Sequence, residues 1–338
     1  MISPMTFCIS VFNGNLNYLQ KAVDSIVKYA YYKNPLNFVI YNEYNEKDLE
    51  SLKKYEAWYN GLLSSNPNIS SIYCRDFTGE EDLNKKNKLY YSGIGGGMNF
   101  CAEKVKTDYI MFVHADMVVS KNFDLKAWEI AQKYKDIPTW ISSQRFQPNL
   151  FLEESRPGTL VFPYEEFGYT HENFNENYFI EYAEEFSKMN PDIEYTKGEG
   201  VSGLIKKEHW DAIGGNDPIY APGYWEDKDL WMRMQLAGYK FVLTTNSVVF
   251  HFGSRSANSN FPDDSQIIIG QKAIRSERSK QNEIKAAQAF QWKWKFWPEQ
   301  NEHGFDIFPR HLNKDDYKDR IQLDLDKSYQ YIKLRDKL

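Results

Sequence analysis

Short apolar runs alternate with stretches of helical spacing along the first part of the chain. The spacing predicts helices that begin near Leu16, near Leu49 and just before Met98. The runs between them predict four strands, at residues 6–12, 37–43, 69–74 and 108–114. Strands that alternate with helices of this length are typical of a parallel sheet with helices on its faces.

The second half keeps this pattern only in part. Strands are predicted at 139–146 and at about 240–252, and a helix at about 226–236. Residues 147–199 are acidic and aromatic without sheet periodicity, so we interpret them as an insertion beside the site. From about residue 263 the spacing is helical, which predicts a helical C-terminal extension.

Composition narrows the classes of protein. The 338 residues are 42% apolar, enough for one large domain with an appendage or for two domains. No apolar run approaches the roughly 20 residues that span a bilayer. Three cysteines without CxxC spacing and an N-terminus unlike a signal peptide lead us to expect a cytoplasmic protein. The net charge of −6 gives no general attraction to nucleic acid, and we expect no such partner.

Two residues that could bind a metal ion follow the predicted fourth strand. The stretch "FVHADMVV" places His114 and Asp116 two residues apart between two apolar runs. Ligands of such sheets bind at the carboxyl ends of the strands, and Mg²⁺ or Mn²⁺ needs few carboxylates when substrate phosphates supply further oxygens. A solvated strand end explains this triplet equally well.

Two later stretches add to it. "YWEDKDLW" sets Glu226, Asp227 and Asp229 at the start of a predicted helix, where acids also serve as ordinary caps. "VVFHFGSRS" closes an apolar strand with His251, although a lone histidine there is usually structural.

Taken in order, four segments resemble the family 2 glycosyltransferases, inverting enzymes of the GT-A fold. The resemblance covers about residues 6–256 and is carried by "ISVFNGNLNYLQKAVDSI", "GGGMNFCAEKVKTDYIMFVHADM", "VSGLIKKEHWDAIGGNDPIYAPGYWEDKDLWMRMQLAGYK" and "VVFHFGSRS". It implies a Rossmann-like α/β domain, mostly parallel and flanked by helices.

The resemblance also implies roles for single residues. Asp116 matches the last acid of the family's DxD motif, Asp227 the catalytic base of its ED motif with Glu226 as the competing base, and His251 a ligand of Mn²⁺ or Mg²⁺. His114 replaces the first DxD acid and is a further metal candidate, and "IYNEYNEKD" replaces the family's "VDDGS". The residues expected to bind the donor are Asn13, Asn42, Glu43, Asn99, His114 and Asp116.

The expected function follows from this resemblance. Residues 1–262 would form the glycosyltransferase domain, with 147–199 near the acceptor side, and 263–338 the helical extension. The domain would transfer a sugar from a nucleotide-diphosphate sugar to a glycan, a lipid-linked acceptor or a protein.

Other functions stay open. A non-catalytic carbohydrate-binding relative fits the altered DxD motif. A sugar-phosphate nucleotidyltransferase fits less well because "FNGNLNYL" offers one glycine, and a glycoside hydrolase would need two flanking carboxylates. We expect the aromatic stretch "FQWKWKFW" at 290–297 to pack on the main domain, with a peripheral membrane contact as the alternative.

Overall fold

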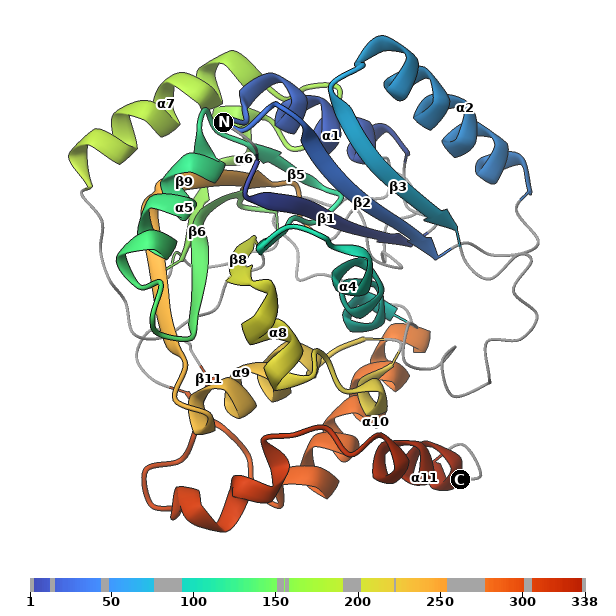
Figure 1. The fold of residues 1–338 in the computed structure, drawn as a ribbon, viewed down its shortest axis with the longest axis vertical. Coiled ribbons are helices and arrows are strands. Elements are labelled where there is room, and N and C mark those ends of the chain that lie inside the picture. Colours follow the sequence, from blue (N-terminus) through green and yellow to red (C-terminus); the bar gives the residue numbers. More distant parts are fainter. Residues whose placement is uncertain are drawn as a thin grey trace.

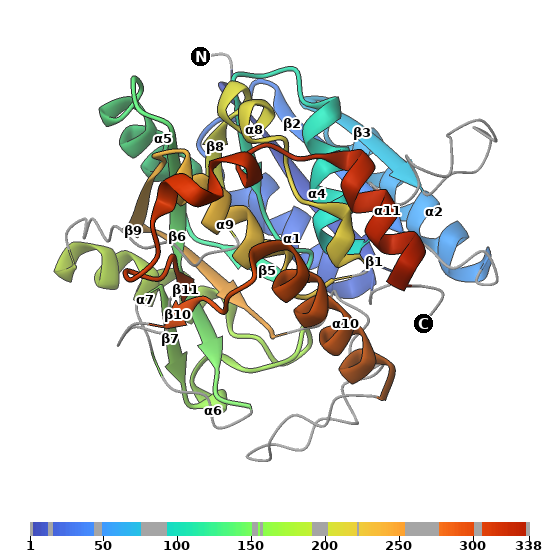
Figure 2. The same cartoon turned by 90° about the horizontal axis from the view of Figure 1, so that it is seen from below.

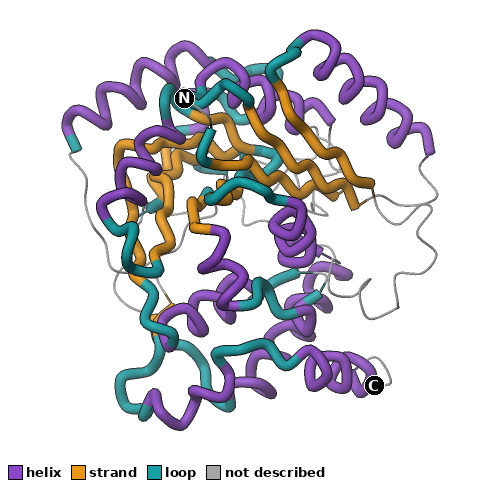
Figure 3. The backbone as a smooth tube through the Cα atoms, viewed as in Figure 1, coloured by secondary structure: helices purple, strands orange, loops and turns teal. Residues whose placement is uncertain are grey.

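A single large sheet forms the centre of the protein, with helices on both faces and further helices beneath it (Figure 1). The computed structural model describes residues 3–12, 16–43, 49–75, 93–150, 155, 158–190, 202–221, 223–253, 277–300 and 306–335. Figure 3 shows the strands gathered between the helices. No helix within these ranges is both long and apolar enough to cross a membrane.

Within the described ranges the sheet has nine strands, and its main path runs β3-β2-β1-β4-β8-β6-β9-β5, with β7 beside β6. The strands are β1 Met5–Phe12, β2 Leu36–Glu43, β3 Ile69–Arg75, β4 Tyr109–Phe112, β5 Met117–Val119, β6 Thr139–Pro148, β7 Thr159–Phe162, β8 Gly203–Lys206 and β9 Lys240–His251.

Strand direction decides where the site can form. Strands β3, β2, β1 and β4 are parallel neighbours, and β8 is antiparallel to both β4 and β6. Strand β6 therefore points the same way as β4, and β9 is parallel to β6. The carboxyl ends of β4, β6 and β9 consequently lie on one edge of the sheet, where such folds bind ligands.

Two helical layers cover the sheet. The first core lies between the sheet and the helices α1 Leu16–Tyr29, α2 Leu49–Ser65, α5 Phe123–Lys133, α6 Tyr164–Phe167 and α7 Glu176–Met189. The second core lies between the opposite face and the helices α4 Gly93–Lys104, α8 Lys207–Ile213 and α9 Glu226–Leu236. Gly97 allows helix α4 to lie close to the sheet, since a Cβ at this position would come within 2.6 Å of the Ser10 side chain.

The C-terminal segments form a third core beneath α9 (Figure 2). They comprise α10 Glu277–Trp294, the short strands β10 Glu299–Gln300 and β11 Asp306–Ile307, the 3₁₀ helix η3 Lys314–Arg320 and α11 Leu325–Arg335. This core also includes the 3₁₀ helix η1 Pro218–Tyr220. Phe290 and Trp294 are fully buried in it, which confirms the predicted packing of the 290–297 stretch, while Trp292 and Trp297 stay partly exposed.

The architecture confirms the predicted α/β fold with a helical C-terminal extension. The structure adds β7, α6 and α7 within 147–199, where no sheet pattern was recognised. The proposed boundary at residue 262 lies outside the described residues, so the division into two domains stays a prediction.

A buried network of charges joins α9 to the C-terminal helices. The Asp229 carboxylate accepts hydrogen bonds from Arg233 at 2.8 Å and from Trp294 at 2.8 Å, and Lys293 lies 2.7 Å away. Tyr220 of η1 also donates to Asp229. Burial alone would raise the pKa of Asp229, but Lys293 and Arg233 outweigh it and hold this pKa below its usual value.

We expect Asp229→Asn to lower the free energy of unfolding by about 3–5 kcal/mol, because it leaves Arg233 and Lys293 buried without their shared counter-charge. Urea denaturation followed by tryptophan fluorescence measures this loss. The control is Asp324→Asn, which changes an exposed ion pair with Lys327 and should leave stability nearly unchanged. Equal effects of the two substitutions would contradict the structural role of Asp229.

Candidate functional site

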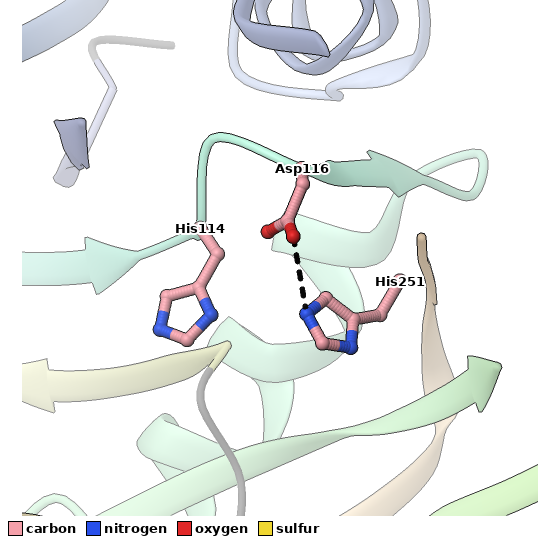
Figure 4. A group of neighbouring side chains, drawn as sticks. All are labelled: His114, Asp116 and His251. Atoms are coloured by element: carbon pink, nitrogen blue, oxygen red, sulfur yellow. Dashed lines mark ion pairs between the residues drawn. The ribbon is translucent and has the colours of Figure 1, made fainter. Parts of the chain in front are cut away.

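Three side chains meet at the carboxyl edge of the sheet, and we call His114, Asp116 and His251 the His–Asp–His cluster (Figure 4). His114 and Asp116 lie between the end of β4 and the start of β5, and His251 is the last residue of β9. Strand β5 pairs with β9 so that Met117 lies opposite His251. The turn after β4 therefore leads the chain into β5 and brings Asp116 to the end of β9.

The cluster is compact. One candidate ligand atom from each of the three residues lies within 4.8 Å of the others, and Nε2 of His251 is 3.5 Å from Oδ2 of Asp116. Asp116 is fully buried.

The prediction that Asp116 and His251 lie close together is confirmed. The expected reason for His114 was wrong, because a turn rather than a continuing strand brings it to the same side.

His114 is held in its neutral form. Burial lowers the pKa of its imidazole to about 4, with Asp116 opposing the shift and the charges of His251 and Arg145 adding to it. Its Nε2 is buried with no hydrogen-bond partner among the described residues. A neutral imidazole is the form that binds metals, and a buried polar atom without a partner suggests a bound group.

The side chains of the cluster are suitable ligands for a divalent cation. Two imidazoles and a carboxylate are ligand types for transition metals such as Mn²⁺, and ligands about 2.1 Å from one ion lie up to about 4 Å apart. The separations within the cluster are close to this limit. Small side-chain movements would bring all three residues onto one ion.

Strand β6 contributes two residues that the sequence pattern did not indicate. Oε1 of Gln147 lies 3.0 Å from Nδ1 of His251. Arg145, two residues earlier, donates to the Thr159 hydroxyl, and its positive charge acts on His114. Gln147 and Arg145 share a face of β6, opposite to Phe146 in the first core.

The acid pair, Glu226 and Asp227, opens helix α9. Glu226 is buried, and burial together with the neighbouring charge of Asp227 raises the pKa of Glu226 to about 8. Its Cγ approaches α4 so closely that a Cβ at Gly95 would lie 3.2 Å away. Asp227 is only partly buried. Near neutral pH, Glu226 therefore keeps its proton while Asp227 offers a more accessible carboxyl group.

The backbone before the acid pair is strained. Tyr224 and Trp225 have φ angles of 73° and 67°, a conformation that bulky residues rarely adopt. Trp225 packs on Phe290 and Trp297, and Lys228 lies 4.2 Å above its ring. Such strain persists where surrounding contacts enforce it and is common at functional sites.

Strand β4 relates the start of the cluster to helix α9. Ile110 and Phe112 of β4 point into the second core, which α9 also covers, whereas Met111, Val113 and Ala115 belong to the first core. His114 follows shortly after Phe112, so the cluster begins directly beyond the strand end that packs in the same core as α9.

The other residues predicted to bind a donor have separate outcomes. Asn42 is buried near the carboxyl end of β2, and Glu43 is the last residue of that strand. Both stay predictions. Asn13 lies outside the described residues. Asn99 bonds the backbone N–H and carbonyl of Asn216, which gives its amide a structural role and offers no support for donor contact.

Comparisons with known proteins place the fold. No family model matches the chain. Three uncharacterized proteins, from Mycobacterium bovis and two strains of Mycobacterium tuberculosis, are 34% identical over 65 residues, which is 19% of this chain and 25% of each relative. The chain thus matches about a quarter of the length of these curated relatives.

Solved structures give the wider likeness. GalNAc-T7, crystallised with UDP, GalNAc and Mn²⁺, superposes with a TM-score of 0.50 at 14% identity, over 85% of this chain and 48% of that chain. TarS of S. aureus gives 0.46 at 10% identity, over 75% of this chain and 37% of TarS. The mannosyltransferase PcManGT of Pyrobaculum calidifontis, in complex with GDP-Man and Mn²⁺, gives 0.43 at 12% identity, over 74% and 57%.

At identities this low, a structural match shows a shared fold and nothing more. This chain spans about half the length of GalNAc-T7, and the superposition on it shows the GT-A glycosyltransferase fold that the sequence predicted.

The acid pair gives a pH-dependent prediction. Folding raises the pKa of Glu226 from 4.5 to about 8, so between these values the native protein holds a proton that the unfolded chain has released. The contribution of Glu226 to the free energy of unfolding therefore falls as pH rises through this window, by up to about 1.4 kcal/mol per pH unit.

Urea denaturation at several pH values tests this for the wild type and for Glu226→Gln, which cannot ionise. We expect the variant to gain stability relative to the wild type as pH rises. Parallel pH profiles for the two proteins would show that Glu226 titrates normally.

Proposed function

We propose that this protein is an inverting glycosyltransferase that moves a sugar from a nucleotide-diphosphate sugar to an acceptor hydroxyl. The observation that carries the proposal is the His–Asp–His cluster at the carboxyl edge of a GT-A sheet, directly beyond the end of β4, which packs in the same core as α9. GalNAc-T7 was crystallised with UDP, and the likeness in fold to that protein supports a nucleotide-diphosphate donor here.

The cluster is the proposed donor end of the site. Asp116 and His251, with His114 as a further candidate, would hold Mn²⁺ or Mg²⁺, which supplies positive charge against the diphosphate. Arg145 brings a second positive charge to the His114 side of the cluster. Asn42, Glu43 and Asn13 remain the proposed contacts to the nucleotide.

The acid pair is the proposed acceptor end. Asp227 would take the proton of the acceptor hydroxyl while the hydroxyl oxygen attacks the anomeric carbon of the sugar. The bond between that carbon and the diphosphate breaks in the same step, and the nucleoside diphosphate leaves. The more exposed Asp227 suits this role, because Glu226 is protonated near neutral pH and is then a poor base. One Asp227 oxygen accepts a hydrogen bond from the Lys228 N–H at 2.8 Å, which orients its carboxylate.

The acceptor is a glycan, a lipid-linked sugar or a protein in this proposal. Residues 147–199 remain the proposed acceptor-side segment, and a cytoplasmic location remains part of the hypothesis. Partly exposed Trp292 and Trp297 are the residues that a peripheral membrane contact would use.

The metal is tested without turnover. We expect Asp116→Asn and His251→Ala each to weaken Mn²⁺ binding by more than the roughly 10–100-fold that loss of an outer contact costs. Electron paramagnetic resonance of free Mn²⁺ measures the dissociation constants. His311→Ala, at an exposed histidine, is the control and should bind Mn²⁺ like the wild type.

The base is tested by a pair of isosteric variants. Asp227→Asn keeps the shape of the side chain and removes the proton acceptor, so we expect turnover to fall by roughly 10²–10⁴-fold with nucleotide affinity nearly unchanged. Glu226→Gln copies the protonated form of Glu226 and should retain most of the transfer activity. Wild-type transfer by Asp227→Asn would refute the assignment, and lost nucleotide binding would move Asp227 to donor recognition.

A further inference from the structure

Gln147 lies beside His251 because of the register between β6 and β9. Arg145 pairs with Val249 and Phe146 with Phe250, so the next step along both strands places Gln147 next to His251. The side chains of the two residues meet at the ends of these strands, and Gln147 is itself buried there.

The contact selects one tautomer of the imidazole. Oε1 of Gln147 lies 3.0 Å from Nδ1 of His251, and a carbonyl oxygen can only accept a hydrogen bond. Nδ1 of a neutral His251 must then carry the proton, which leaves the lone pair on Nε2. Figure 4 shows that this second nitrogen faces Asp116, and the distance to Oδ2 is 3.5 Å.

This arrangement has an electrostatic consequence. A carboxylate oxygen and a bare imidazole nitrogen both present lone pairs, and they repel each other unless a proton or a cation lies between them. A residue that holds the proton on Nδ1 keeps Nε2 available to a cation. Histidine ligands of metals generally donate their other N–H to such a partner.

We propose that Gln147 is a positioning residue that fixes His251 as its Nδ1–H tautomer and so presents Nε2 to a divalent cation shared with Asp116. The inference rests on the metal site of the proposed function. It assigns to β6 a residue that touches neither donor nor acceptor and acts through His251.

Three variants separate positioning from simple packing. Gln147→Met keeps the length of the side chain without the acceptor, and Gln147→Glu restores an acceptor. Gln144→Met is the matched control, because Gln144 is a buried glutamine of the same strand whose amide donates to the Arg145 carbonyl instead.

The first readout needs no metal. Nitrogen-15 NMR of the histidine rings at about pH 8, where imidazoles are neutral, reports which nitrogen of His251 is protonated, with His251→Ala used for assignment. We expect the Nδ1–H form in the wild type, in Gln147→Glu and in Gln144→Met, and a mixture of tautomers in Gln147→Met.

The second readout is Mn²⁺ affinity. We expect Gln147→Met to weaken binding by about 10–100-fold, Gln147→Glu to restore it and Gln144→Met to leave it unchanged. Wild-type affinity and an unchanged tautomer in Gln147→Met would overturn this inference alone. A wild-type protein that binds no Mn²⁺ would instead overturn the metal site of the proposed function.

Discussion

The buried carboxylate of Asp229 holds together the part of the protein on which the acid pair depends. Arg233 and Lys293 meet at this one side chain from α9 and α10, and Arg233 also donates to the backbone carbonyls of Ile213 and Gly215. A buried charge is stable only while its partners remain in place. The first turn of α9 is therefore fixed from α8 and from the C-terminal helices at once.

This anchoring explains how the strained turn before α9 persists. Positive φ angles at Tyr224 and Trp225 cost of order 1–3 kcal/mol each, and the packing of Trp225 on Phe290 and Trp297 opposes that cost. The C-terminal helices thus act on the acid pair through Asp229 and through Trp225. The C-terminal helices therefore support the candidate site structurally.

The elements that follow from the sequence are those whose pattern is local and repeated. Helix α9 begins and ends at the predicted residues, and β2 and β9 lie within a residue of their predicted bounds, because apolar period and polar caps act over neighbouring positions. The meeting of Asp116 with His251 followed from parallel strands ending on one edge. Strands β5, β7 and β8 have three or four residues each, too few to display a period.

The contacts that were missed are those that register creates between distant segments. A glutamine within a strand carries no signal of its own, and only the β6–β9 pairing brings Gln147 to His251. The ion pair between Lys293 and Asp229 carries no local signal either, because the sequence shows Asp229 only as one of three acids in the first turn of a helix. The structure separates these acids into a structural Asp229, a protonated Glu226 and a partly exposed Asp227.

The replacement of the first DxD acid by His114 changes the charge of the proposed donor site. With neutral imidazoles at His114 and His251, Asp116 would be the one negative ligand of a divalent cation, so a net charge of +1 would face the diphosphate. A second carboxylate would cancel it. Burial holds the pKa of His114 at about 4, so its ring does not add a charge that repels the cation. In this site the histidine would strengthen the attraction for the diphosphate, and Arg145 acts in the same direction.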